Sequence, residues 1–139
     1  MPTLTPDVEA AFNTGAKLVH LITLHADGRP QVTVVWTGVE AGEIVIAHMR
    51  EHQKLRNIRR DPRVALSVMT GGRTAYGLDE YRVVEGTARV TEGGAAELLN
   101  KLAQRYMGPG TKYPPMDDPP AGFVTRVTVA KVGGVGPWA

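Results

Sequence analysis

The apolar positions of the chain fall into short runs, each ended by residues that favour turns. Residues 17–25 carry an apolar run of strand length, and Asp27-Gly28 after it is a pair typical of tight hairpins. Residues 31–39 alternate apolar and polar side chains, as a strand with one buried and one wetter face does. Further strands are predicted at 44–49, 64–69, 81–91 and 123–132, while 73–80 fits either strand or loop. Six short strands joined mostly by hairpin turns predict a mainly β, antiparallel barrel whose first three strands form a meander.

Helical signals separate some of these strands. Thr5-Pro6-Asp7 supplies a cap, a first-turn proline and an acidic residue, which together open a short helix. Residues 51–60 have helical periodicity until Pro62 prevents continuation. A third helix is predicted before Gly108, and the Pro-rich stretch after it makes residues 106–120 a candidate lid.

The composition of the 139 residues, 42% hydrophobic and 22% charged, predicts one folded domain over residues 1–139. The chain has no cysteine, which excludes disulfides, thiolate nucleophiles and cysteine-ligated metals. Met1-Pro2-Thr3 lacks the basic and apolar stretches of a signal peptide, so we expect a cytoplasmic protein. Neither a GxGxxG fingerprint after the first strand nor a P-loop is present, which disfavours a doubly wound nucleotide-binding fold.

The formal net charge is only +2, but residues 50–63 hold six basic and two acidic side chains, a local excess of +4. A predicted strand runs here directly into a predicted helix, with Lys54 and Asn57 three residues apart in its first turns. Unpaired amides, the positive end of a helix dipole and a lysine together suit an anion such as phosphate. A solvated basic helix face is the alternative, and the spacing alone does not separate the two.

The segment from Ile46 to Arg63 resembles the signature of the pyridoxamine 5'-phosphate oxidase-like superfamily. Its FMN-binding branch has Ser-x-Lys at the helix start, and His52-Gln53-Lys54 keeps the lysine but replaces the serine. Residues 54–63 are similar to the flavin/deazaflavin oxidoreductases of actinobacteria, whose B group uses coenzyme F420. The segments Asp27–Gln31, Glu85–Ala88 and Val132–Trp138 resemble the same group, so the resemblance covers most of the chain.

This resemblance implies a split β-barrel of the FMN-binding type, an antiparallel six-stranded Greek-key barrel with a few short helices. It also implies an F420-dependent oxidoreductase that transfers a hydride between the deazaflavin and a small unsaturated or quinone-like substrate. The alternatives are an FMN-binding pyridoxamine 5'-phosphate oxidase-like oxidoreductase and a cofactor-binding protein without catalysis. A deazaflavin with an oligoglutamate tail would suit the local excess of positive charge.

The resemblance also implies a set of cofactor contacts, in a homodimer with its sites at the subunit interface. Strand residues would lie against the ring and line its side, and the following residues would hold the phosphate or an acidic tail. Tyr76 and Trp138 would cap the substrate cavity, from either subunit, with core or interface packing as the alternative for both aromatic side chains. The full set comprises Thr33, Val34, Val35, Ala47, His48, Met49, Arg50, His52, Lys54, Asn57, Tyr76 and Trp138.

The sequence gives weaker support for other kinds of site. His48 and His52 have the spacing of helical metal ligands, but His48 is predicted on a strand, so we expect no metal site. The basic segment lacks the interleaved aromatic residues of a single-strand binder, and we expect neither a nucleic-acid nor a membrane partner. No catalytic side chain is assigned. Solvent, His48 and Tyr76 all remain candidates for the proton donor.

Overall fold

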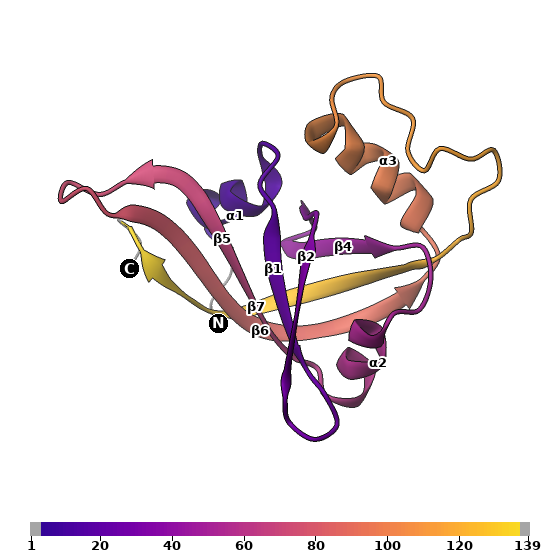
Figure 1. Cartoon of the computed structure of the whole chain (residues 1–139), viewed down its shortest axis with the longest axis horizontal. Helices are drawn as coiled ribbons and strands as arrows, with labels where there is room; N and C mark the ends of the chain where they lie inside the picture. The colour runs from indigo at the N-terminus through magenta and orange to yellow at the C-terminus, as the bar shows by residue number, and fades with distance from the viewer. Residues whose placement is uncertain (1–3, 137–139) are drawn as a thin grey trace.

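A computed structural model describes residues 4–136 of the chain, which within this range forms seven strands and three helices (Figure 1). The strands form one antiparallel sheet in the order β2-β1-β5-β6-β7-β4-β3. In chain order the elements are α1 (Pro6–Asn13), β1 (Val19–Leu24), β2 (Pro30–Val35), β3 (Gly38–Glu40), β4 (Glu43–His48), α2 (Gln53–Arg60), β5 (Arg63–Arg73), β6 (Asp79–Glu92), α3 (Ala95–Tyr106) and β7 (Phe123–Val135). The mainly β, antiparallel prediction is confirmed.

The first hairpin forms where Asp27-Gly28 predicts it. Gly28 has a φ of +87°, a conformation that glycine adopts readily, and β1 pairs with β2 from Val19 opposite Val35 to Leu24 opposite Pro30. The predicted meander of the first three strands is interrupted. The first half of the predicted strand 31–39 pairs with β1 as β2, whereas its end belongs to β3, which pairs with β4, and the other neighbour of β4 is β7.

The strand predicted over 31–39 divides at Thr37, and this adds a seventh strand to the predicted six. The Thr37 hydroxyl donates to the carbonyl oxygen of Phe12 at 2.8 Å, and its backbone N–H donates to the Tyr106 hydroxyl at 3.2 Å. These bonds join Thr37 to α1 and α3 instead of to a neighbouring strand. The three residues that follow start again as β3, an edge strand that pairs only with β4 among the described residues.

The sheet bends along its long strands. The register of β6 against β7 shifts between Glu85 and Gly86, and a Cβ at Gly86 would lie 2.1 Å from the carbonyl oxygen of Thr128. Glycine is therefore required where the two backbones approach so closely. The segment 73–80, predicted as strand or loop, is the tip of a long β5–β6 hairpin that projects away from α2 and α3 (Figure 1).

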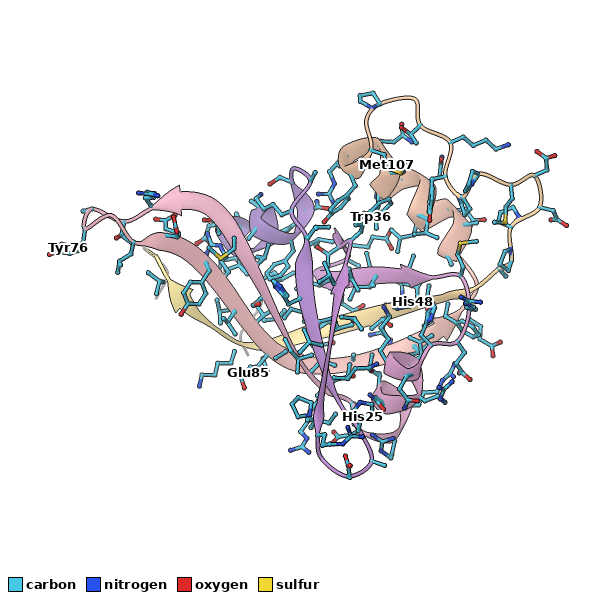
Figure 2. The ribbon with its side chains drawn as sticks, in the orientation of Figure 1. His25, Trp36, His48, Tyr76, Glu85 and Met107 are labelled. Atoms are coloured by element: carbon cyan, nitrogen blue, oxygen red, sulfur yellow. The ribbon has the colours of Figure 1, made fainter. Side chains whose placement is uncertain are left out.

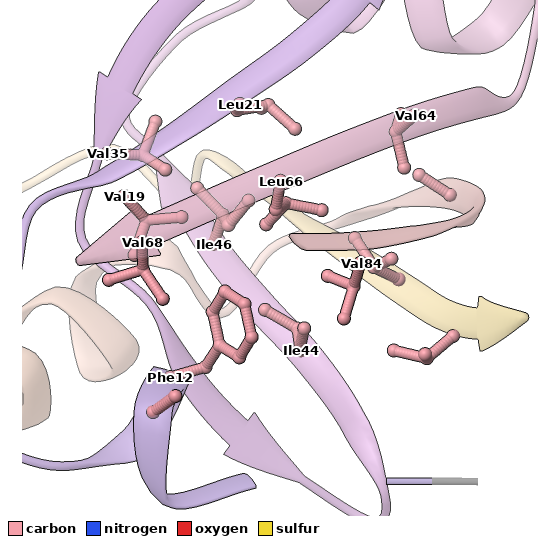
Figure 3. Packing of buried hydrophobic residues seen from close by; sticks show 14 of the residues in the cluster. Phe12, Val19, Leu21, Val35, Ile44, Ile46, Val64, Leu66, Val68 and Val84 are labelled. Carbon is pink, nitrogen blue, oxygen red and sulfur yellow. The ribbon is translucent and has the colours of Figure 1, made fainter. Parts of the chain in front are cut away.

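Strand β4 is buried on both faces. Its Ile44 and Ile46 join the main core around Phe12, which is 1% exposed (Figure 3), while Val45 packs with Leu98 of α3 in a second cluster. The continuous apolar run in this strand is what two buried faces require. The last residues of β4 then leave the core at the start of the segment that leads to α2.

No helix within residues 4–136 is long and apolar enough to cross a membrane.

We expect Phe12→Ala to lower the free energy of unfolding by about 3–5 kcal/mol, because it removes the aromatic ring that fills the main core and leaves a cavity. Urea denaturation followed by circular dichroism measures the change. Met107→Ala, at an exposed position after α3, is the control and should change the stability by less than about 0.5 kcal/mol. Equal losses in both variants would contradict the assigned core.

Candidate functional site

A cleft lies where β4 leads into α2, beneath the segment 107–122, and consists of two adjoining cavities of about 520 and 210 Å³. The larger, outer cavity is lined by the turn between β4 and α2, with α3 and the 107–122 segment opposite: Ala47, His48, Met49, Arg50, His52, Lys54, Leu99, Tyr113, Met116 and Pro120. The inner cavity is lined mostly by residues with apolar side chains and reaches the end of β2: Val34, Val35, Trp36, Ile46, Ala47, Lys54, Leu99, Leu102 and Tyr113. Lys54 and Tyr113 line both cavities.

Most of the side chains predicted from the sequence meet in this cleft, although they come from different elements. Those that line it are Val34, Val35, Ala47, His48, Met49, Arg50, His52 and Lys54. Their contacts with a cofactor stay predictions. What the structure shows is that β2, the end of β4 and the start of α2 converge on one hollow.

The other predicted residues that the structure describes do not line either cavity within the subunit. The Thr33 hydroxyl is buried on β2 and has no hydrogen-bond partner among residues 4–136. Tyr76 is 93% exposed at the tip of the β5–β6 hairpin, on the opposite side of the molecule from His48 (Figure 2). Trp138 lies outside the described residues.

Asn57 is fully buried and joins α2 to the first hairpin. Its side-chain amide donates to the Thr23 hydroxyl at 3.1 Å and to the Gln31 carbonyl oxygen at 3.0 Å, and its own carbonyl oxygen accepts from Gln53 at 2.9 Å. The side chain therefore faces the sheet, whereas Lys54 of the same helix lines the cleft. Asn57 positions the helix, and its phosphate contact stays a prediction.

Some of the basic side chains of residues 50–63 have partners within the protein. Arg59 forms an ion pair with Glu51, Arg63 forms one with Asp61, and Arg60 donates to the Leu24 carbonyl oxygen. Neither Arg50 nor Lys54 has an ion-pair partner among residues 4–136, and both line the outer cavity. Two of the four basic side chains of this segment without an ion pair among the described residues thus lie at the mouth of the cleft.

The start of α2 adds to this positive region. His52 takes the N-cap position with an extended backbone and makes no side-chain capping hydrogen bond. Desolvation lowers the pKa of Lys54, and the pKa of His52 is lowered first by burial and then by the charges of Lys54, Arg50 and Arg56. The surroundings of Lys54 and His52 therefore disfavour their protonated forms. A bound anion would stabilise these forms, because it offsets both the desolvation and the repulsion between the positive charges.

His48 is 4% exposed and its Nε2 lies 2.8 Å from the Thr125 hydroxyl. Burial, followed by the positive charges of Lys54 and His52, lowers its pKa to about 3. The imidazole is therefore neutral at pH 7 and forms a fixed polar wall of the cleft. A protonated His48 is not available as a proton donor at that pH.

Two aromatic residues that the sequence interpretation missed, Trp36 and Tyr113, line the cleft, and a third, Tyr106, packs against Trp36. The Trp36 ring stacks on Tyr106, with centroids 4.9 Å apart and planes 8° from parallel, and Tyr113 lies 5.6 Å from Trp36 at 52°. These residues come from three separate segments, so no periodicity links them. The only available signal was their presence in a chain with few aromatic residues, 6% of the total.

The candidate lid contributes to the cleft wall, since Tyr113, Met116 and Pro120 line the outer cavity. Among the described residues, no group of three or more histidine, aspartate or glutamate side chains is placed to hold a metal ion. The rings of His48 and His52 have centroids 6.3 Å apart.

The comparisons with known proteins agree with this architecture. The family model described as pyridoxamine 5'-phosphate oxidase matches residues 4–136. The chain belongs to this family. Members of the pyridoxamine 5'-phosphate oxidase family share the flavin-type oxidoreductase fold seen here, in which a mainly β barrel carries short helices.

Solved structures similar to the chain include an F420 reductase with 25% sequence identity and a TM-score of 0.69, covering 93% of this chain and 98% of that one. A conserved hypothetical protein from Mycobacterium tuberculosis has 29% identity and a TM-score of 0.71, with 95% and 85% covered. General stress protein 26 from Bacillus anthracis, at 20% identity, a TM-score of 0.62 and coverages of 91% and 90%, supports the fold alone. A comparison with curated proteins found no match.

We expect the stability of the protein to fall as the pH drops from about 6.5 toward 3, because unfolded His48 takes up a proton in this range while folded His48 does not. The contribution of neutral, buried His48 to the free energy of unfolding is fully present above the pKa of His48 in the unfolded chain. Its loss between pH 7 and pH 4 is on the order of 3 kcal/mol. Urea denaturation at each pH measures it.

His48→Gln keeps a polar partner for Thr125 but does not titrate, so its stability should depend less steeply on pH than that of the wild type. His25→Gln, near the turn of the first hairpin, is the matched control and should keep the wild-type slope. A His48→Gln profile parallel to the wild type would show that His48 does not carry this dependence.

Proposed function

We propose that the protein is a cytoplasmic reductase that binds the deazaflavin coenzyme F420 in the cleft between β4, α2 and the 107–122 segment. The observation that carries this proposal is the combination of two unpaired cations, Arg50 and Lys54, with an adjoining apolar and aromatic hollow. A molecule that joins a flat ring to anionic groups fits both parts of such a site.

The residues present suit the cofactor. The outer cavity of about 520 Å³ lies within the usual range of small-molecule sites, roughly 300–1,000 Å³. Arg50, His52 and Lys54 would hold the phosphate and carboxylates, and Val34 and Val35 would lie against the ring. When bound, the reduced deazaflavin supplies a hydride to a small unsaturated or quinone-like substrate.

Two observations favour F420 over FMN. His52 stands where the FMN-binding branch has serine, so an imidazole replaces a hydroxyl that would bind phosphate. Arg56 is exposed on the same helix, beyond the two cations of the cleft, and provides a third positive charge for an extended acidic tail. The similarity to an F420 reductase supports the same choice.

The chain's own residues orient ligands and restrict water rather than perform covalent chemistry. Leu99, Trp36 and Tyr113 remove water from the inner cavity, which strengthens the interaction of Lys54 with an anion. His48 is neutral, and Tyr76 of the same subunit lies on the far side of the molecule. We infer that solvent at the open mouth of the outer cavity supplies the proton.

We also propose that the protein is a homodimer that associates through the outer face of β2, β1 and β5. Leu18, Val32, Val34 and Met69 are each more than half exposed there, and Val32 pairs across the sheet with Ile22. Apolar side chains gathered on one exposed sheet face favour burial against an identical face. In such a dimer, Tyr76 of one subunit would reach the cleft of the other, although it does not approach the cleft of its own subunit.

We expect Lys54→Ala to weaken F420 binding by about tenfold to 150-fold, corresponding to the loss of roughly 1.5–3 kcal/mol from a hydrogen bond to a charged group. Titration of the purified protein, followed by deazaflavin fluorescence, measures the dissociation constants for F420 and for FMN. The matched control Lys101→Ala removes an exposed lysine from α3, outside the cleft, and should leave both constants unchanged.

Tighter binding of FMN than of F420 would assign the protein to the flavin branch. Binding of neither cofactor would contradict the proposed function.

We expect Val32→Asp to shift the protein from dimer toward monomer, because the new carboxylate would be buried without a partner at the proposed interface. Sedimentation velocity at several protein concentrations measures the distribution. Met107→Asp introduces the same charge at an exposed apolar position just after α3 and should remain dimeric. A wild-type protein that sediments as a monomer at all concentrations would exclude the homodimer.

A further inference from the structure

His48 ends β4 and lies between the barrel and the outer cavity, which it lines. Its Nε2 atom is bound to the hydroxyl of Thr125 on the neighbouring strand β7, at 2.8 Å. The other ring nitrogen, Nδ1, has no hydrogen-bond partner among residues 4–136, and it is not one of the buried polar atoms that lack a partner. Solvent in the outer cavity therefore reaches Nδ1.

The hydrogen bond between His48 and Thr125 can form in two ways. The imidazole is neutral at pH 7, so it carries a single N–H. Either the Thr125 hydroxyl donates to Nε2, which leaves the imidazole proton on Nδ1, or Nε2–H donates to the hydroxyl oxygen. In the second arrangement the hydroxyl hydrogen of Thr125 needs another acceptor. Thr125 is fully buried, and its hydroxyl makes no other hydrogen bond within the described part of the chain.

The two arrangements differ in where they leave an unpaired donor. In the first, the free donor is Nδ1–H, which lies where water or a ligand can accept from it. In the second, the free donor is a hydroxyl hydrogen that no solvent reaches. An unpaired buried donor disfavours that arrangement by roughly fivefold to 150-fold. The tautomer of His48 is thus set by its buried partner.

We propose that Thr125 holds His48 in the Nδ1–H tautomer, and that His48 is a specificity-determining residue that donates this hydrogen bond to an oxygen atom of the molecule bound in the outer cavity. Thr125 is a positioning residue, because it acts through His48 and lines neither cavity of the cleft. A carbonyl, carboxylate or phosphate oxygen suits the Nδ1–H donor. A group that can only donate, such as a protonated amine, is excluded, since Nδ1 then offers no lone pair.

The cations beside His48 favour the same kind of atom. The His52 ring has its centroid 6.3 Å from that of His48, and Arg50 and Lys54 line the same cavity. These side chains attract a partly or fully negative oxygen. A neutral N–H adds a fixed direction to this attraction without adding to the repulsion among the cations.

This inference rests on the proposed function for the source of the oxygen, which in F420 is either a carbonyl of the ring or an oxygen of the phosphate. Its first test requires no cofactor. Proton–nitrogen correlation spectra distinguish the two neutral tautomers of histidine, and the chain has four histidines. The signals that disappear in His48→Gln belong to His48.

In the ligand-free protein we expect His48 to carry its proton on Nδ1. Thr125→Ser keeps the hydroxyl and should keep this tautomer, whereas Thr125→Val removes the hydroxyl at nearly the same volume and should lower the share of Nδ1–H. A parent protein with the proton on Nε2 would overturn the inference. An unchanged share in Thr125→Val would overturn the role of Thr125.

The second test measures F420 binding in two variants that each keep one end of the ring. The amide of His48→Gln lies near the position of Nε2 and supplies no donor at Nδ1, whereas the amide of His48→Asn lies near the position of Nδ1. We expect His48→Gln to weaken binding by about twofold to tenfold if the oxygen is a neutral carbonyl, and by more than about tenfold if it belongs to the phosphate. His48→Asn should recover part of this loss. A merely structural role would penalise the shorter asparagine at least as much as glutamine.

The deazaflavin riboside, which lacks the phosphate and the acidic tail, separates the two sources of the oxygen. A loss in His48→Gln for both ligands would assign the bond to the ring carbonyl, and a loss for F420 alone would assign it to the phosphate. Equal affinities of the parent protein and His48→Gln for both ligands would overturn the inference.

Failure of the proposed function would show instead as absent F420 binding in the parent protein, with the Nδ1–H tautomer intact. Inorganic phosphate would then be the probe. Its addition should shift the Nδ1 signal of His48, and an unchanged signal would overturn the inference.

Discussion

The burial of β4 on both faces is the constraint on which the rest of the cleft depends. One face of the strand packs into the core around Phe12, and the other packs against α3 through Val45. A strand held on both sides cannot shift without opening one of two cores. The chain therefore leaves the barrel at a defined point, and Ala47 and His48 reach the cleft from a rigid element, as precise binding requires.

The positive charge at the cleft comes from basic side chains that have no ion-pair partner among the described residues. The segment after β4 has many basic side chains. Arg59 and Arg63 form ion pairs with nearby acidic residues, and Arg60 donates a hydrogen bond to a backbone carbonyl oxygen. Arg50 and Lys54, which have no ion-pair partner among the described residues, lie at the opening of a hollow whose inner part is lined mostly by residues with apolar side chains. Their interaction with an anion is less screened there than on an open surface, because the surrounding dielectric is lower.

Local sequence signals predicted the elements well, since each depends on neighbouring residues. The Asp27-Gly28 turn, the proline at the start of α1 and the stop at Pro62 all acted where the sequence placed them. Pairing beyond the first hairpin was not predictable in this way. The division at Thr37 arises from bonds to Phe12 and Tyr106, residues 25 and 69 positions away, which no local pattern encodes.

The same distinction applies to the candidate site. The family resemblance identified the run from Ala47 to Lys54, because those residues are contiguous and carry the basic signal. It did not show that Asn57 faces the sheet, since this depends on Thr23 and Gln31 of the first hairpin. Nor did it indicate the wall of Trp36, Tyr106 and Tyr113, which come together only when α3 packs beside β4.

The attachment of the 107–122 segment has a consequence for how such a protein diversifies. Asn100 and Gln104 bind backbone groups of the segment, so the hydrogen bonds do not depend on which side chains the segment carries. Its outer residues, such as the exposed Asp117 and Asp118, can change without loss of the attachment. Helix α3 thus holds a segment whose sequence can vary. A new ligand preference can be acquired by replacing a few residues of this segment, without any change in the barrel or in the cationic end of the cleft.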